Sequence, residues 1–479
     1  MSEPIKIFIF PLPAIGHSNP ILKTVDELIR TFKANVTIYS LEKFKNNIVS
    51  IGAEYRQLND SKYEDWTNLN NNPLDLISSL FTKNYEFANN DSLRIAKDID
   101  RDKPDLVLHD SFSFTAKFAM RILKEYYSRI DSIRGANDPN LFIPTSLPPP
   151  VIVYWTTFTN ADNIYPNEFE KQYSLQLSFM DKFWLIYTLL KFSFIANKLA
   201  KKFQVTYQTP FDDLARRDPN DVNIVFTFPE LHPRSHLFDK KTFFVGSCIS
   251  ENAHINGDIP CEDEEFKELL KDYPILNEYT RKESQEKKLI YVSLGTVYNE
   301  IRRLYSILIE AFSNFDQLSI DIDDAKIKLN SMQIIFSLGP SVYKHFDQLV
   351  KENKIKIPKI MHLAPSCPQL EILKRASLFI THSGMNSTSE SIHYAVPMLC
   401  MPLNGDQPLN AYRVAIELGL GLYFDYKTVN EIDIVKGIHR ILSDSSYYAR
   451  CNHYSKLSRQ YIGHKNAAET IIKLTNAKA

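Results

Sequence analysis

A polar turn follows an apolar strand near residue 380 and could bind an anion. Residues 378–381 are apolar or β-branched, and the turn after them reads His-Ser-Gly-Met-Asn-Ser-Thr. Asparagine, serine and threonine favour turns and caps, so we expect a helix to begin near Asn386 or Ser387. The first N–H groups of a helix have no partner within it and lie at the positive end of its dipole. The segment predicts a phosphate site, although an ordinary capped turn explains it equally well.

Side chains of the same turn could add to these backbone donors. Gly384 would let the backbone approach a ligand closely, because it has no side chain. His382 could donate a hydrogen bond to the phosphate, and the hydroxyls of Ser387 and Thr388 could do likewise. The helix dipole alone would favour an anion by roughly 0.3 to 2 kcal/mol.

A histidine and an aspartate in the first part of the chain could form an acid–base pair. His17 follows an apolar run at 5–10, and Asn19-Pro20 is typical of a helix start, so we expect His17 on a strand-to-helix loop. Asp110 ends another predicted strand at the same sheet edge, where its carboxylate could accept the imidazole N–H and stabilise the imidazolium. A lone histidine in a loop is usually structural. Asp110 could instead cap a helix over 112–123, and it could both cap this helix and accept the His17 N–H.

Short apolar strands alternate with helical patterns in two halves of the chain. The first half contains predicted strands at 5–10, 36–39, 105–109 and 151–155, and the second at 289–295, 333–339, 378–381 and 398–403. Such alternation predicts an α/β fold with two parallel sheets, each covered by helices on both faces. Ligands of these sheets bind outside the carboxyl ends of the strands, so a cleft between two domains is the expected ligand site.

Composition excludes several classes of protein. The 479 residues are 44% hydrophobic and 24% charged with a net charge of −1, which indicates a soluble globular protein of two domains. Nucleic acid is not an expected partner, because lysine and arginine are spread along the chain. The five cysteines are an odd number without paired spacing, so neither a disulfide framework nor a zinc site is indicated. A reducing, cytoplasmic location is expected.

Neither of the two most apolar segments predicts membrane insertion. The run at 5–15 follows Glu3 instead of a cationic segment, and Pro11 and Pro13 interrupt it, so it is not a signal peptide. The stretch 183–196 is too short to span a bilayer and contains Lys191. We therefore expect no transmembrane helix.

Five motifs together resemble the family 1 nucleotide-sugar glycosyltransferases of GT-B fold. They are GHSNP, PELHP, VSLGT, CPQLEIL and FITHSGMNSTSESIHYAVPMLCMPLNGDQPLNA, in this order along the chain. The sequence is most similar in appearance to the soluble microbial macrolide- and flavonoid-type enzymes. The resemblance implies two Rossmann-like β/α/β domains that face each other across a cleft. The implied divisions are an acceptor-binding domain at 1–235, a linker at 236–262, a nucleotide-sugar-binding domain at 263–450, and a C-terminal helical segment at 451–479 packing toward the first domain.

The resemblance also implies roles for individual residues. His17 would be the general base and Asp110 its partner, while Thr296 and His382 would contact the β-phosphate. In the donor motif, Asn386 and Ser387 would contact the α-phosphate. The remaining residues that the resemblance assigns to the donor are Glu390 on the ribose hydroxyls, Asp406 and Gln407 on the sugar hydroxyls, and Ser366, Gln369, Gly384 and Met385 within the motif. Asp406 and Gln407 could equally serve only to form a turn at NGDQP.

The chain departs from the family pattern at the start of the donor motif. The plant branch places there a tryptophan that stacks on uracil, and here the position is Ser366. Met385 replaces a second family tryptophan, as in the microbial members. Residues 314–331 resemble an insertion and contain Asp321-Ile322-Asp323, a pattern that binds metal in a different glycosyltransferase fold. We interpret this segment as a solvated acidic loop, and the resemblance implies neither a metal nor another cofactor.

The implied activity is transfer of a hexose, glucose above all, from a UDP-sugar to a hydroxyl of a small hydrophobic acceptor, with inversion. Polyphenols, macrolides, sterols and lipids are suitable acceptors. The aromatic residues of 175–203 and those around Trp66, Phe81, Tyr85 and Phe87 either line the acceptor pocket or form the core. Peripheral membrane contact is a third reading of 175–203, where Lys191, Lys198, Lys201 and Lys202 lie beside apolar residues.

Two other classes of protein remain open. A sugar-nucleotide epimerase or another GT-B enzyme could use the same donor half, and so could a non-catalytic nucleotide-sugar-binding protein. An NAD-dependent enzyme is disfavoured, since no Gly-x-Gly-x-x-Gly follows either opening strand. We expect a monomer.

Overall fold

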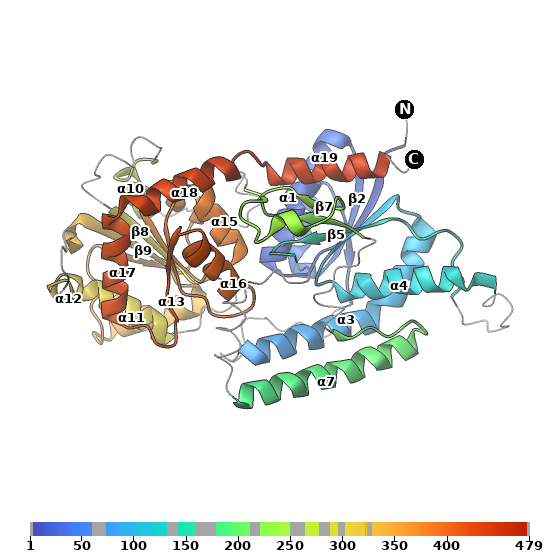
Figure 1. The fold of residues 1–479 in the computed structure, drawn as a ribbon, viewed down its shortest axis with the longest axis horizontal. Helices are drawn as coiled ribbons and strands as arrows, with labels where there is room; N and C mark the ends of the chain where they lie inside the picture. Colours follow the sequence, from blue (N-terminus) through green and yellow to red (C-terminus); the bar gives the residue numbers. More distant parts are fainter. Residues whose placement is uncertain are drawn as a thin grey trace. The chain divides into compact units, whose positions relative to one another are not determined.

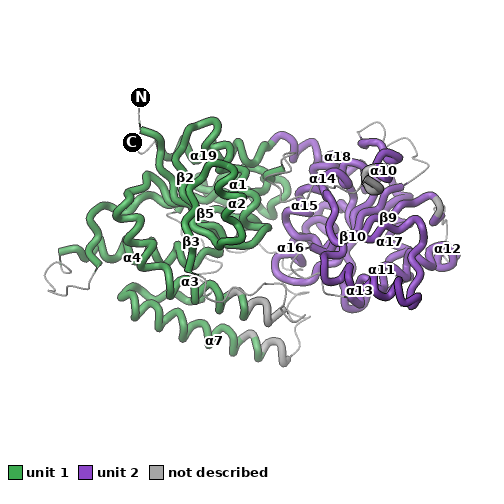
Figure 2. The backbone as a smooth tube through the Cα atoms, turned by 180° about the vertical axis from the view of Figure 1, so that it is seen from behind, with its two compact units in different colours: residues 1–64, 74–249, 461–479 green, residues 65–73, 250–460 purple. Residues whose placement is uncertain are grey.

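The chain divides into two compact units in the computed structural model. The structure describes residues 3–59, 73–131, 142–159, 179–210, 221–249, 264–276, 288–295, 302–320, 322 and 328–476. Unit 1 comprises residues 1–64, 74–249 and 461–479, and unit 2 comprises residues 65–73 and 250–460 (Figure 2). The chain therefore returns to unit 1 at its C-terminal end.

Unit 1 contains a parallel sheet of seven strands in the order β3-β2-β1-β4-β5-β6-β7. The strands are β1 (Lys6–Phe10), β2 (Asn35–Ser40), β3 (Glu54–Gln57), β4 (Leu106–Asp110), β5 (Val151–Trp155), β6 (Val222–Val225) and β7 (Thr242–Phe244). The chain builds the sheet outward from β1 in one direction and then from β4 in the other. Ligand sites of such sheets lie where the strand order reverses, here at the carboxyl ends of β1 and β4.

Helices cover both faces of this sheet. They are α1 (Ile15–Phe32), α2 (Lys45–Ser50), α3 (Pro73–Asp102), α4 (Phe114–Ser128), α7 (Phe179–Lys202) and α19 (Gly463–Asn476), with short 3₁₀ turns η1 (Glu42–Phe44) and η3 (Ser235–Leu237). Helices α1 and α19 lie on one side of the sheet and α3, α4 and α7 on the other (Figure 1). Helix α19 belongs to unit 1, whereas residues 451–460 before it belong to unit 2.

Helix α19 approaches unit 1 through a close contact between two glycines. A side chain at Gly463 would place its Cβ 2.3 Å from the carbonyl oxygen of Gly246. Gly246 itself has a φ of +93°, a conformation that other residues rarely adopt. Asn466 adds a hydrogen bond from its amide nitrogen to the Val245 carbonyl at 3.0 Å.

Aromatic side chains form the core between α3, α4 and α7. The rings of Phe81 and Phe192 stack with their centroids 5.0 Å apart, and Tyr85 meets Phe114 edge-on at the same distance. Phe81 and Tyr85 are each 2% exposed. Of the two readings that the sequence left open for Phe81, Tyr85 and Phe87, the structure supports packing in the core, and Trp66 lies outside the described residues.

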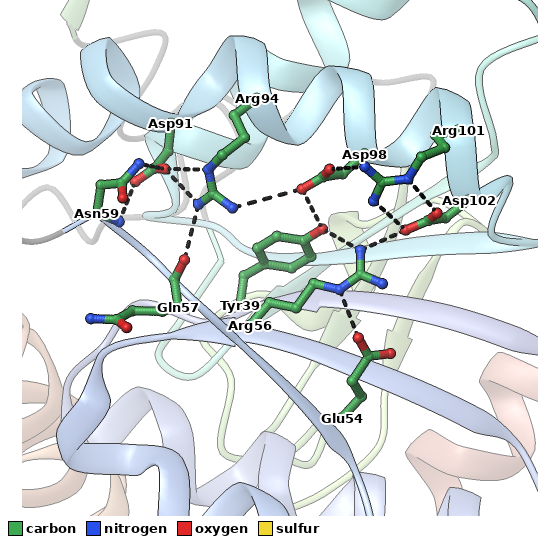
Figure 3. A network of polar contacts seen from close by, with 10 residues as sticks. All are labelled: Tyr39, Glu54, Arg56, Gln57, Asn59, Asp91, Arg94, Asp98, Arg101 and Asp102. Carbon is green, nitrogen blue, oxygen red and sulfur yellow. Dashed lines mark hydrogen bonds and ion pairs between the residues drawn. The ribbon is translucent and has the colours of Figure 1, made fainter.

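A network of ion pairs fastens α3 to the edge of the same sheet (Figure 3). Arg56 on β3 bonds to Asp102 on α3 at 2.6 Å and to Glu54 at 2.8 Å. The hydroxyl of Tyr39 on β2 accepts from Arg56 and donates to Asp98 at 3.1 Å. Hydrogen bonds from Arg101 and Arg56 lower the pKa of Asp102 to about 2, against the opposing effect of its burial. Helix α3 is thereby held to β2 and β3.

Unit 2 repeats the architecture with a parallel sheet of six strands in the order β10-β9-β8-β11-β12-β13. The strands are β8 (Lys288–Ser293), β9 (Met332–Ser337), β10 (Met361–Ala364), β11 (Leu378–Thr381), β12 (Met398–Cys400) and β13 (Gly421–Tyr423). The strand order reverses between β8 and β11, so this sheet also has its switch point after its first strand. Two such Rossmann-like units confirm the predicted GT-B class of fold.

The helices of unit 2 alternate with these strands. They are α10 (Glu264–Lys271), α11 (Arg302–Ser313), α12 (Phe315–Leu318), α13 (Pro340–Lys351), α14 (Gln369–Leu373), α15 (Met385–His393), α16 (Gln407–Ala411), α17 (Glu431–Ser443) and α18 (Ser445–Ser458), with a 3₁₀ turn η4 (Leu329–Ser331) and a π-helical segment η5 (Tyr412–Glu417). None of the described helices of the chain is long and apolar enough to cross a membrane.

Two helix starts differ from the predictions. Helix α1 begins at Ile15 instead of at Asn19-Pro20, because the N–H groups of His17 and Ser18 already bond to the Ala14 carbonyl at 3.0 and 2.8 Å. Helix α15 begins at Met385, one residue before the predicted start, because Gly384 takes the extended N-cap conformation. Residues 242–244, which the sequence analysis placed in the linker, form strand β7 of unit 1.

Candidate functional site

A buried aspartate contacts a histidine at the switch point of unit 1. Nδ1 of His17 lies 2.9 Å from Oδ2 of Asp110. The side chain of Asp110 is fully buried and that of His17 is 23% exposed, so the imidazole reaches the surface while its partner does not. The other carboxylate oxygen accepts the N–H of Phe112 at 2.8 Å. Asp110 therefore orders the turn before α4 and contacts His17 at the same time.

The local fold explains why these two residues meet. Asp110 is the last residue of β4, and β4 pairs directly with β1. His17 follows β1 and lies in the first turn of α1, so the prediction that it sits in a loop is wrong. Pro20 lies inside α1. A helical turn fixes the histidine backbone more firmly than a loop would.

A third residue, which the sequence analysis missed, contacts the same imidazole nitrogen. Oγ1 of Thr156 lies 2.9 Å from Nδ1 of His17. Thr156 comes directly after β5, the strand that pairs with β4. Two oxygens therefore surround Nδ1, and a proton held there leaves Nε2 as the ring nitrogen that can accept another.

The histidine of the PELHP motif holds the segment that carries Thr156. Nε2 of the buried His232 accepts the backbone N–H of Thr159 at 3.0 Å. Its ring packs edge-on against Phe158, with centroids 5.1 Å apart. A neutral His232 with its proton on Nδ1 satisfies both this bond and the one to the Pro233 carbonyl at 2.9 Å.

In unit 2, His382 lies between two glycines of neighbouring loops. A Cβ at Gly295, after β8, or at Gly384, after β11, would each lie 2.6 Å from Nε2 of His382. Strands β8 and β11 are adjacent and flank the switch point. Both glycines are thus required by the position of one imidazole. The ring nitrogen that they approach is at the start of α15.

The loop that carries His382 has an unusual backbone. Ser383 has a φ of +64°, which costs a residue with a side chain of order 1 kcal/mol or more. Its conformation is supported by a bond from its N–H to Oγ1 of Thr381 at 3.2 Å and by the amide of Asn410, which donates to its carbonyl at 3.0 Å. Asn410 also donates to Asp406 at 2.9 Å, which joins the loop to α16.

Burial keeps the His382 imidazole neutral at neutral pH. Loss of solvent around the ring lowers its pKa to about 4, against smaller opposing effects of Asp406 and the Ser293 backbone. A neutral imidazole can donate one hydrogen bond. The first N–H groups of α15, like those of any helix, have no hydrogen-bond partner within the helix. The hydroxyl of Thr388, in the first turn, is buried and has no hydrogen-bond partner among the described residues. The region can therefore supply several donors to one anion.

Three more of the predicted residues form a cluster beside α15. The amide nitrogen of Gln369 donates to Glu390 at 2.6 Å and to the hydroxyl of Ser387 at 3.2 Å. Gln369 begins α14, and the other two lie on α15. Gln369 thus joins α14 to the Glu390 and Ser387 side chains of α15.

Comparisons with known proteins agree with this arrangement. A model of the family described as "UDP-glucoronosyl and UDP-glucosyl transferase" matches residues 348–461, which include Gln369, His382 and Glu390. The protein named "Uncharacterized UDP-glucosyltransferase YojK" of Bacillus subtilis (strain 168) is 23% identical over 474 residues, 98% of each chain. The solved structure of the glycotransferase of kitacinnamycin has a TM-score of 0.69 at 19% identity over 98% of this chain and 99% of that one. CalG4, the calicheamicin glycosyltransferase, gives 0.64 at 18% over 100% of both.

The chain is a family 1 glycosyltransferase of GT-B fold. It is an enzyme of the UDP-glycosyltransferase class, which transfers a sugar from a UDP-sugar.

The other residues of unit 2 that the sequence analysis named differ in their burial and contacts in this glycosyltransferase. Asp406 is half-buried and occupies the N-cap position of α16 without a capping bond from its side chain. Gln407 uses its amide oxygen to accept the N–H groups of Leu403 and Asn404 at 2.9 and 3.2 Å. Its amide nitrogen is the group that could donate to a sugar. Ser366 is exposed in the loop after β10, Met385 is buried at the start of α15, and Asn386 beside it is half-buried. Thr296, Asp321 and Asp323 lie outside the described residues.

No group of three or more possible metal ligands occurs within the parts of the glycosyltransferase that the structure describes.

Thr156 and His232 are the residues of the unit 1 site that sequence reasoning missed. The one usable signal was their position: Thr156 follows a buried strand, and polar residues at carboxyl ends of parallel strands gather at one edge.

Proposed function

We propose that this glycosyltransferase moves glucose from UDP-glucose to a hydroxyl of a small hydrophobic acceptor with inversion at the anomeric carbon, and that His17 is the general base. The contact between His17 and the buried Asp110 is the observation that carries the proposal. A partly exposed imidazole with its inner nitrogen held by a carboxylate is suited to accept a proton at its outer nitrogen.

The proton transfer would proceed at Nε2 of His17. The acceptor O–H bond breaks, its proton passes to Nε2, and the oxygen forms a bond to the anomeric carbon. The bond from that carbon to the β-phosphate oxygen breaks, and UDP leaves with the electron pair. Asp110 would stabilise the imidazolium, and base catalysis of this kind contributes about 10² to 10⁴ in rate.

The leaving diphosphate would bind at the start of α15. His382 and the helix N–H groups would stabilise negative charge that grows as the bond to the sugar breaks, which lowers the barrier as well as holding the donor. Glu390, positioned by Gln369, would bind the ribose hydroxyls, because two carboxylate oxygens suit a vicinal diol. Asp406 and the amide nitrogen of Gln407 would bind the sugar hydroxyls.

The sugar and the acceptor class rest on the names of relatives together with the resemblance. The relative from Bacillus subtilis is named a UDP-glucosyltransferase, which supports glucose as the sugar. The solved relatives are named for kitacinnamycin and calicheamicin. The proposed acceptor, a polyphenol, macrolide, sterol or lipid, rests on the family resemblance.

A direct test combines an acceptor screen with a matched pair of histidine variants. UDP-glucose and other sugar nucleotides are incubated with phenolic, macrolide, sterol and lipid acceptors, and products are read by mass and their anomeric configuration by NMR. His17→Ala should lower transfer by at least about 10² while UDP affinity, measured by calorimetry, stays within about twofold. His236→Ala removes an exposed histidine of the same unit and should leave both quantities unchanged.

Three results would contradict the proposal. Activity of His17→Ala within about tenfold of the parent enzyme would remove the base assignment. An α-configured glucoside from UDP-glucose would contradict inversion. An epimerised sugar nucleotide without transfer would favour the epimerase alternative.

A further inference from the structure

Helix α7 carries a band of large apolar side chains on its exposed surface. Phe183, Trp184, Ile186, Tyr187, Leu190 and Phe194 are each between 50% and 72% exposed. The opposite face of α7 is buried, with Phe192 at 0% and Leu199 at 4%, and Phe192 stacks on Phe81 of α3. Single exposed apolar residues are normal on a protein surface, but a continuous band marks an interaction site.

The spacing of these residues places them along one line. Positions 183, 187, 190 and 194 are separated by four, three and four residues, which aligns them on one face of a helix. Trp184 and Ile186 flank the line, and the rings of Trp184 and Tyr187 meet edge-on with centroids 5.6 Å apart. The exposed apolar face therefore extends over about three turns. We call these six residues the α7 band.

The charges of the described side chains on α7 have a single sign; Asp181 and Lys182, near the start of the helix, are not among those side chains. Its described side chains include four exposed lysines, at 191, 198, 201 and 202, and no carboxylate. At 100° per residue, Lys198 and Lys201 continue the face of the α7 band toward the C-terminal end. Lys202 is instead tied to α3, because it donates to the carbonyl and side-chain oxygens of Asn89 at 3.0 and 2.7 Å. Apolar residues followed by cations on one face favour a partner that is both apolar and anionic.

We propose that the α7 band docks on the surface of an anionic lipid bilayer. Tryptophan and tyrosine prefer the boundary between hydrocarbon and water, and lysines there can reach lipid phosphates while their stems stay apolar. No described helix can span a membrane, so α7 lies in the plane of the interface with its band toward the acyl chains. The buried face of the helix keeps its contacts with α3 in this arrangement.

A bilayer explains the α7 band better than a folded partner does. Protein interfaces surround an apolar centre with a polar rim of mixed donors and acceptors. The charges described on α7 beside the band are ammonium groups alone, which attract a surface of negative potential by about 1 kcal/mol for each lysine close to it. The proposal does not depend on the reaction assigned to His17.

Vesicle binding by the full-length chain tests the proposal. Vesicles of phosphatidylcholine with 30% or so phosphatidylglycerol should sediment the protein, and vesicles of phosphatidylcholine alone should bind at least about tenfold more weakly. Trp184 should shift its emission to shorter wavelength on binding, and Trp184→Phe should remove that shift. Leu190→Glu with Phe194→Glu, and separately Lys198→Glu with Lys201→Glu, should each weaken binding by about tenfold or more.

A matched control separates the α7 band from apolar exposure in general. Ile320→Glu changes a residue of unit 2 that is 78% exposed, and it should leave vesicle binding unchanged. All variants should keep the parent far-ultraviolet spectrum and unfolding midpoint, since the altered side chains lie outside the core. Equal binding to both kinds of vesicle, or binding that the α7 variants do not alter, would overturn the proposal. A dimer in light scattering that Leu190→Glu dissociates, with no vesicle binding, would assign the face to a second copy instead.

Discussion

Nδ1 of His17 lies 2.9 Å from Oδ2 of Asp110, although 93 residues separate them in the chain. Pairing of β1 with β4 brings them together, because Phe10 and His109 are register partners at the ends of these strands. The same carboxylate accepts the N–H of Phe112 through its other oxygen. Asp110 is therefore fixed before His17 changes its protonation state, which is the condition for an oriented base.

Asp110→Asn should lower kcat by about 10² or more while the donor KM changes little. The asparagine oxygen can still accept the Phe112 N–H, so the turn should survive. Its amide nitrogen would face Nδ1 as a donor, which favours the imidazole tautomer with its proton on Nε2 and removes the base. Steady-state kinetics with a phenolic acceptor measures the effect.

The matched control for this substitution is Asp105→Asn, immediately before the opposite end of β4. Its carboxylate is exposed and accepts only the Lys6 N–H in the described structure, at 2.7 Å. Kinetics of this variant should equal those of the parent enzyme. If Asp110→Asn were equally active, Asp110 would have only its structural role in the turn.

Thr156→Val should reduce kcat by roughly three- to tenfold, the usual effect of losing one hydrogen bond. The variant keeps the shape of the side chain but removes the oxygen 2.9 Å from Nδ1 of His17. Nε2 becomes less basic without that oxygen, so the acid limb of the pH profile of kcat/KM should move to lower pH. Thr156→Ser should restore both quantities. A loss that serine does not restore would indicate that the threonine methyl group, and therefore packing, is what matters.

The central strands could be predicted from the sequence, and the edge strands could not. Strands such as β1 and β11 are buried on both faces, so they appear as continuous apolar runs. Strand β3 reads Glu-Tyr-Arg-Gln and has exposed ends, because it lies at the edge of its sheet. No apolar run identifies such a strand, and its pairing with β2 is a long-range property.

The polar turn between β11 and α15 could be predicted because strand, turn and helix are contiguous in sequence. The start of α1 was misplaced because proline usually occupies the first helical position. Here Pro20 removes only one interior bond, and the turn before it is held by the Ala14 carbonyl. The contacts of Thr156 and His232 could not be predicted, since they depend on which strands become neighbours.

His109→Gln should make unfolding of unit 1 less dependent on pH. Burial, with a smaller effect of Lys117, lowers the pKa of His109 to about 4. The unfolded chain binds a proton at this ring below about pH 6.5, so between these values the unfolded state holds more protons and the free energy of unfolding falls as the pH falls. From pH 7 to pH 5 this histidine should account for roughly 2 kcal/mol of that loss.

Urea unfolding at both pH values, followed by fluorescence of the buried Trp155 on β5, measures the difference. Glutamine can still donate to the Asp110 carbonyl, which now lies 2.8 Å from Nδ1 of the ring. The decisive quantity is the change between pH 7 and pH 5, so a uniform loss of stability does not affect the comparison. An identical pH dependence in parent and variant would show that His109 is not the group responsible.

Gly384→Ala should weaken donor binding by roughly 10- to 100-fold, the range for a lost hydrogen bond to a charged group. Gly384 has a φ of −60°, which alanine adopts without strain, so only the added methyl group matters. That group would lie 2.6 Å from Nε2 of His382, and Gly295 closes off the other side of the ring. The imidazole must therefore move. Calorimetric titration with UDP of Gly384→Ala, His382→Ala and the double variant tests this steric cause. In the absence of the His382 ring, the alanine at 384 should lower UDP affinity by less than about twofold. If the two substitutions instead lower UDP affinity additively, the steric mechanism is refuted.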